Sequence, residues 1–118
     1  MKTDRDFSPI TPSETRDLAF DFKHDTFELD PTEYLVSAVF ALAVVATDDG
    51  ATVDASPISR LSGSATIADN QDGDVDMATV QRVTGMTDGN TYDVICRATT
   101  SRGQVLELNA HIACRVAT

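Results

Sequence analysis

Residues 83–116 read VTGMTDGNTYDVICRATTSRGQVLELNAHIACRV, and this pattern predicts two long antiparallel strands joined by a tight turn. Side chains alternate along both arms, so that large apolar residues share one face. The inward set comprises Tyr92, Val94, Cys96 and Ala98 on the first arm and Leu106, Leu108, Ala110, Ile112, Cys114 and Val116 on the second. The turn falls at residues 101–103, where Gly103 supplies the positive φ that a three-residue hairpin turn requires.

This turn also predicts the register, because it places Thr100 opposite Gln104. The pairs that follow are Arg97 with Glu107 and Asp93 with His111 on the outer face, and Cys96 with Leu108 and Tyr92 with Ile112 inside. A slip by one residue would mix charged and apolar side chains on both faces, so the pattern and the turn agree on one register. We therefore interpret the outer row as two cross-strand charge pairs of a scaffold and not as a catalytic cluster.

Shorter alternating segments upstream predict further strands at residues 16–23, 52–56, 64–69 and 77–83, with a loop at 25–31. With residues 32–47, this makes about seven strands separated by turn signals. Such a pattern is typical of an all-β sandwich of the immunoglobulin-like or fibronectin type III-like kind. Tyr92 fits the tyrosine that these domains often carry near the start of the penultimate strand, whose hydroxyl bonds to the backbone just upstream. An ordinary core tyrosine is the alternative.

Residues 32–47 carry signals for both helix and strand. Asp30, Pro31 and Glu33 are typical of a helix start, and the alanines that follow favour a helix. Against this, a bulkier face alternates with a smaller one, and β-branched residues are frequent. The bulkier face consists of Tyr34, Val36, Ala38, Phe40, Leu42 and Val44. We favour a strand that is apolar on both sides, which would lie in the middle of a sandwich or bury its second face against another subunit.

The length of 118 residues predicts one domain, at residues 16–118, preceded by an extended N-terminal arm at residues 1–15. The arm has two prolines and mixed charges, and its large apolar side chains are Phe7 and Ile10. One interpretation is a disordered terminus. The other is an arm that packs on a neighbouring subunit through Phe7 and Ile10.

Composition argues against several classes of function. The net charge of −10 and the pI of about 4.3 argue against binding to nucleic acid phosphates. The longest apolar run, residues 35–46, is much shorter than the roughly 20 residues of a membrane helix, and the polar start of the chain does not resemble a signal peptide. The hairpin register separates Cys96 from Cys114 by roughly 20 Å, so we expect two free buried thiols in a reducing cytoplasm.

The acidic loop at residues 69–76 is the one segment with a metal-binding pattern. Asn70, Asp72 and Asp74 alternate as calcium ligands do at the start of an EF-hand loop. The sixth and twelfth places of such a loop hold Val75 and Gln81, where glycine and glutamate are needed, so a solvated turn is the preferred interpretation. We predict no catalytic residues and no cofactor, and hence a protein that is not an enzyme.

From residue 16 to residue 116 the chain resembles a family of small tailed-bacteriophage virion proteins, the fibre-tail adaptor or neck proteins. The matching features are the opening LAFDF strand, the LDPTEYLVSA segment, and the Gly-rich loop, Thr-Tyr, Thr-Thr and turn glycine of the final hairpin. The match departs from the family pattern at residues 51–76 and before residue 16.

The resemblance implies an immunoglobulin-like module in the virion, assembled in the host cytoplasm. It would lie at the head-tail neck (the head-tail connector region) or at a fibre attachment point, as a homo-oligomer in a symmetric multi-copy assembly whose partners are other virion proteins. The alternatives are a carbohydrate- or receptor-binding β-sandwich and a capsid decoration protein. A sugar platform needs exposed aromatic side chains, and the chain has no Trp and only two Tyr.

Overall fold

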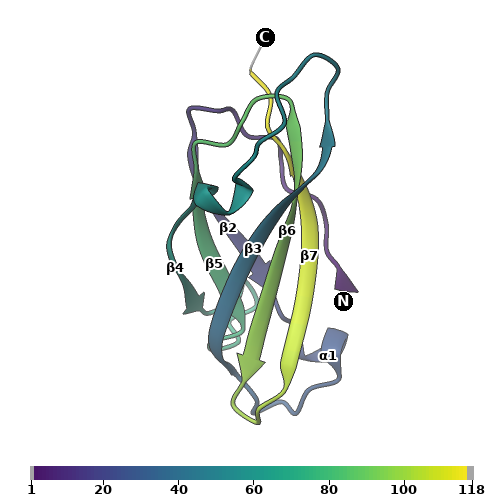
Figure 1. The fold of residues 1–118 in the computed structure, drawn as a ribbon. Coiled ribbons are helices and arrows are strands. Elements are labelled where there is room, and N and C mark those ends of the chain that lie inside the picture. The colour runs from purple at the N-terminus through teal and green to yellow at the C-terminus, as the bar shows by residue number, and fades with distance from the viewer. Residues whose placement is uncertain (1, 117–118) are drawn as a thin grey trace.

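The computed structural model describes residues 2–116. Strands whose side chains alternate between apolar and polar faces form two sheets that face each other (Figure 1). One sheet has the order β2-β5-β4, with β2 at Thr15–Asp21, β5 at Ala78–Thr84 and β4 at Leu61–Ala68. The other has the order β1-β7-β6-β3, with β1 at Lys2–Thr3, β7 at Val105–Ala113, β6 at Asn90–Thr100 and β3 at Leu35–Thr47. All neighbours pair antiparallel except β1, which runs parallel to β7.

Helical structure is limited to two short turns in the described residues, α1 at His24–Phe27 and the 3-10 turn η1 at Pro57–Arg60. Neither is long and apolar enough to cross a membrane. The all-β prediction is therefore confirmed, as is the arrangement in two sheets.

The hairpin of β6 and β7 has the predicted register. Arg97 lies opposite Glu107, and Tyr92 lies opposite Ile112. The Thr100 amide donates to the Gln104 carbonyl at 2.8 Å, and Gly103 takes a φ of +81° in the turn. The inward side chains are buried as expected, except that Leu106 is only half-buried and Val116, beyond the end of β7, is exposed.

The core lies between the two sheets and is built from their alternating inward residues. The rings of Phe20 on β2 and Phe40 on β3 stack across the sandwich with centroids 5.8 Å apart. Fully buried neighbours include Leu18, Phe22, Met77, Val83, Tyr92 and Val94. Each large side chain buried in this way contributes about 1.5–3 kcal/mol, so this layer is the main source of stability.

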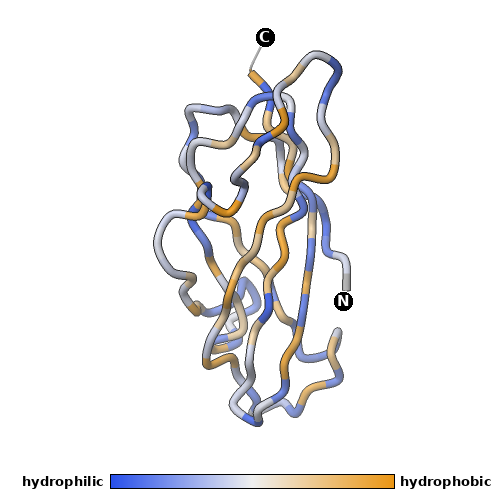
Figure 2. The backbone as a smooth tube through the Cα atoms, viewed as in Figure 1, coloured by the Kyte–Doolittle hydropathy of each residue, from blue (hydrophilic) through white to orange (hydrophobic). Residues whose placement is uncertain are grey.

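Residues 35–47 form a strand, as favoured, and the helix alternative is wrong. Figure 2 shows that β3 carries none of the strongly hydrophilic colour that marks charged residues elsewhere. The predicted faces hold from Ala38 to Val44, but an irregularity between Leu35 and Ser37 shifts the phase. Val36 and Tyr34 are therefore exposed where burial was predicted, and Leu35 is buried in their place.

Two predicted local elements are wrong. Residues 52–56 do not form a strand, because Asp54 and Asn90 use their side chains to bind the main chain of this segment, which takes its amides out of any ladder. Residues 25–31 are not wholly loop, since α1 lies at their start and packs Phe27 on Phe22 at 5.6 Å.

The N-terminal arm lies along the chain's own β7, which neither interpretation of the arm anticipated. The amides of Phe7 and Ile10 donate to the carbonyls of His111 and Ala113 at 3.0 and 2.9 Å. Ile10 is fully buried, and the Phe7 ring packs edge-on against Phe20 at 5.4 Å. The two apolar side chains of the arm thus extend the core of the same molecule.

Candidate functional site

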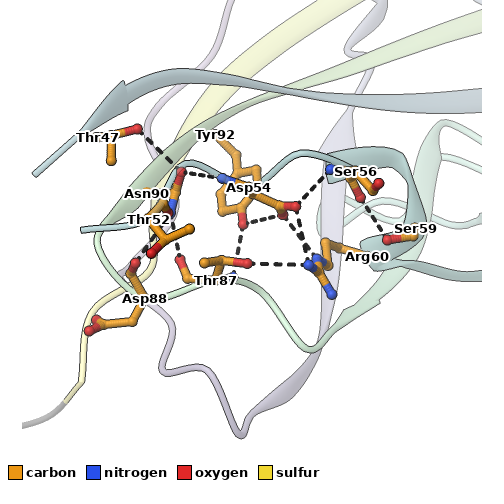
Figure 3. Close-up of polar contacts among 10 residues, drawn as sticks. All are labelled: Thr47, Thr52, Asp54, Ser56, Ser59, Arg60, Thr87, Asp88, Asn90 and Tyr92. Atoms are coloured by element: carbon orange, nitrogen blue, oxygen red, sulfur yellow. Dashed lines mark hydrogen bonds and ion pairs between the residues drawn. The ribbon is translucent and has the colours of Figure 1, made fainter.

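A buried polar network ties together the loops at the end of the sandwich where the C-terminus lies (Figures 1 and 3). Its centre is Asn90, the first residue of β6, which is almost fully buried. The side-chain nitrogen of Asn90, Nδ2, donates to the main-chain carbonyls of Thr52, Thr87 and Asp88 at 2.9–3.3 Å. Its oxygen accepts the Asp54 amide at 3.1 Å. One side chain therefore holds two loops that are far apart in the sequence.

Asp54 is the charged member of this polar network. Arg60 donates to both carboxylate oxygens at 2.9 and 3.1 Å, and the hydroxyl of Tyr92 donates to Oδ2 at 2.7 Å. The Ser56 amide donates to Oδ1 at 2.9 Å. The Arg60 guanidinium in particular lowers the pKa of Asp54 from 3.8 to about 2, against the opposing effect of burial. Asp54 is thus a fixed anion and not a proton acceptor near neutral pH.

Tyr92 makes the backbone contact that its position predicted. Its hydroxyl accepts the Thr87 amide at 2.9 Å while it donates to Asp54. Burial raises the pKa of this hydroxyl, which keeps it protonated as a donor. Tyr92 therefore joins the core to the network just described.

The sequence interpretation missed Asp54, Arg60 and Asn90. The one local signal is the Asp54-x-Ser56 spacing, which is typical of a turn closed by an aspartate side chain. In the described residues every buried side-chain nitrogen or oxygen has a hydrogen-bond partner. The buried groups of the network thus bind one another and the neighbouring main chain, which fits a structural role.

The opposite end of the sandwich holds a second polar cluster around Glu33. This carboxylate is only 2% exposed, and it accepts hydrogen bonds from the Thr100 hydroxyl and from the Gln104 amide. His24 Nε2 lies 2.8 Å from the Glu33 carbonyl, and its Nδ1 lies 3.9 Å from Asp74. His24, Glu33 and Asp74 line an open hollow of about 410 Å³. The cluster fastens the hairpin turn to the segment that precedes β3.

In the acidic loop at residues 69–76, for which the sequence favours a solvated turn over a calcium site, Asn70 binds groups of the loop itself and of β2. Asn70 Oδ1 accepts the amides of Asp72 and Asp74 at 3.1 and 2.8 Å, and Asn70 Nδ2 donates to Asp21 and Asp74. These bonds turn Asn70 toward its own loop rather than toward a shared centre with the carboxylates. In the described part of the chain, no group of three or more His, Cys, Asp or Glu residues is arranged to hold a metal ion.

Both cysteines are free and buried, as expected. Burial raises the pKa of each thiol to about 11, so neither is a thiolate at neutral pH. Cys96 contacts the Thr79 hydroxyl at 3.3 Å, inside the core. His111 lies on the outer face, 3.9 Å from Asp93, and is directed away from both thiols.

The outer face of β3 and β6 carries exposed apolar side chains. We call "the β3 outer face" the exposed side chains Val39, Ala41 and Ala43 of β3 with the half-buried Ile95 of β6. Val39 is 69% exposed, although it lies on the strand with the fewest polar residues. A shallow hollow of about 520 Å³ opens over Val39, Ala41 and Ile95.

The Arg97–Glu107 pair borders this face. Arg97 donates to Glu107 Oε2 at 2.9 Å, as the predicted register requires. The pair is largely exposed, so it contributes at most about 1 kcal/mol. Its charges mark where the apolar surface ends.

The chain was compared with protein-family models, curated proteins and solved structures. No protein-family model matches this chain, and no curated protein or solved structure matches it either.

Proposed function

We propose that this protein is a structural, non-enzymatic component of a tailed-bacteriophage particle, at the head-tail neck or as a fibre-tail adaptor. It acts through contacts with other virion proteins. The observation that carries the proposal is the β3 outer face, because an exposed, uncharged sheet face is a surface suited to protein contacts. The family resemblance of the β2, β3 and hairpin segments supplies the setting.

The architecture supports an immunoglobulin-like module. A sheet β2-β5-β4 facing a sheet β3-β6-β7, with an N-terminal strand parallel to the last strand, is compatible with that fold. Tyr92 adds a specific feature, because it sits near the start of the penultimate strand and binds the Thr87 amide five residues upstream. A rigid module of this kind suits a repeated position in a symmetric assembly.

A carbohydrate-binding module is the alternative with an observation in its favour. Tyr34 is 46% exposed and lines the hollow that also contains His24, Thr32 and Asp74. An exposed aromatic ring beside polar groups in a hollow is the feature that favours a small-molecule site here. A glycan array with the wild type and with Tyr34→Ala tests this alternative, which requires binding that the substitution abolishes.

The particle itself gives the decisive test of the virion proposal. We expect density-gradient-purified particles of a phage that encodes this chain to contain it at a fixed ratio to the major capsid protein, measured by quantitative mass spectrometry. Cryo-electron microscopy would then place it at the neck, at a fibre attachment point or on the capsid surface. Absence of the chain from purified particles would contradict the proposal, and a position all over the capsid would favour a decoration protein.

A further inference from the structure

We propose that two copies of this protein associate through the free edge of β3. The two β3 strands pair antiparallel about Ala41, which joins the two β1-β7-β6-β3 sheets into one continuous sheet. This inference concerns the isolated chain, and it stands whether or not the protein belongs to a virion.

The main chain of β3 is hydrogen-bonded on one side only. In the sheet order β1-β7-β6-β3 it is the terminal strand. Outside the ladder with β6, the one main-chain bond to β3 among the described residues is from the Leu35 amide to Asp76, at the very start of the strand. Alternate amides and carbonyls further along therefore point outward without a protein partner, and another β-strand is the partner that matches them.

The regular part of β3, between its two irregularities, lacks charged residues and proline, two of the features that usually protect an edge. The 13 residues of β3, LVSAVFALAVVAT, include no charge and no proline. The other sheet has two edge strands: β2 carries Arg16 and Asp17, whereas β4 is also uncharged but is interrupted by a register shift between Ser62 and Thr66. The arm beside β7 carries Asp4 and Arg5. In a chain with a net charge of −10, β3 is thus an edge at which two copies approach without placing like charges in contact.

The charges beyond β3 favour one register. If the apolar outer faces of both copies are to lie on one side of the joined sheet, odd-numbered residues of one β3 must lie opposite odd-numbered residues of the other. A pair centred on Ala41 then places Val39 opposite Ala43 of the other copy. Within each copy Arg97 lies beside Val39, and Asp93 lies beside Ala43. Each end of the joint therefore sets the Arg97 of one copy in the same row as the Asp93 of the other, three strand spacings or about 14 Å away, so charges of opposite sign and not like charges flank the apolar centre.

The irregularities of β3 support the same centre. They fall between Leu35 and Ser37 and between Val44 and Ala46, so the regular part of the strand lies between them. Ala41 is near the middle of this regular part. Irregularities twist an edge away from a partner, which limits the pairing to the central residues and disfavours open-ended stacking.

A cysteine at the centre of the joint tests the geometry directly. Facing residues in an antiparallel pair have Cα atoms about 4.5–5.5 Å apart, which is within the range of a disulfide. We expect Ala41→Cys to form a disulfide-linked dimer under mild oxidation at least ten-fold faster than Val75→Cys. Val75 is a matched control, because it is 66% exposed in a loop that bonds only to the first residue of β3, through Asp76, and not to the part around Ala41. Background from Cys96 and Cys114 is low, because both are fully buried.

Sedimentation equilibrium of the wild type then measures the association itself. We expect a concentration-dependent shift from the 12.7 kDa monomer to the dimer. Val39→Asp gives the joint a charge of the kind that keeps natural edge strands from pairing, and it should weaken the dimer at least ten-fold, whereas Val75→Asp, with the same charge change, should not. A wild type that stays monomeric to about millimolar concentration, equal cross-linking of both cysteine variants, or equal effects of both aspartates would each overturn the proposal.

Discussion

Two regions of the molecule differ in whether their hydrogen-bonding groups have partners. They are the polar network around Asn90 and Asp54 and the free edge of β3. In the network, buried oxygens and nitrogens all have partners within the chain. Along β3, the main-chain groups after Leu35 at the sheet edge have no partner beyond β6 among the described residues. A buried polar group without a partner costs about 1–3 kcal/mol, so an incomplete first region would remove a large share of the stability of the protein. The second is solvated in the monomer and is free to accept a partner.

This contrast separates stability from function. The network contains the charged and polar residues that an active-site search would choose first, and its geometry assigns them to holding loops. The β3 edge contains no residue that such a search would choose. Changes to the first region should therefore affect folding, and changes to the second should affect association.

Asp54→Asn should give the largest loss of stability. The substitution removes the charge that pairs with Arg60 and places an amide nitrogen near the guanidinium, inside a buried site. We expect unfolding free energy to fall by about 3 kcal/mol, measured by urea denaturation at neutral pH.

The matched control is Asp17→Asn. Asp17 also pairs with an arginine, Arg82, but both side chains are more than half exposed. That substitution should cost less than about 1 kcal/mol. Equal losses from the two variants would show that the buried network contributes no more than a surface ion pair.

The sequence predicted the parts of this contrast that depend on local pattern. Alternation and the Gly103 turn together determined the register of β6 and β7, down to the Arg97–Glu107 pair. The alternation also identified β3 as apolar on both sides, which predicted that its second face is buried in the sandwich or against another subunit. The position of Tyr92 near the start of a strand was enough to suggest its hydroxyl contact.

The remaining features depend on contacts between distant segments. Asn90 bonds to Thr52, and nothing in either neighbourhood indicates the other. The irregularity near Leu35 exchanges which side chains are buried without changing the alternation of the sequence. The arm carried no strand pattern, and its position depends on main-chain bonds to β7, which any sequence can make.

Acid should weaken the network by a smaller amount than Asp54→Asn. Because the pKa of Asp54 is depressed to about 2, the unfolded chain takes up this proton at higher pH than the folded one. The resulting stabilisation, about 2 kcal/mol, is complete above the unfolded pKa and disappears as pH falls from about 4 to about 2. The stability difference between the wild type and Asp54→Asn should narrow over this range in urea titrations. A difference that stays constant down to pH 2 would contradict the assigned pKa.

Val39→Asp should have the smallest effect on folding, although it is the substitution expected to disrupt association. Val39 is mostly exposed in the monomer, and the new carboxylate would lie beside Arg97, its neighbour on β6. We expect a loss of less than about 1 kcal/mol, because aspartate has a low strand propensity but gains a charge partner. The measurement belongs at low micromolar protein concentration, where the monomer dominates and the dimer does not contribute to stability. A loss of about 2 kcal/mol or more under those conditions would mean that the β3 outer face supports the fold itself, and the separation of the two regions would fail.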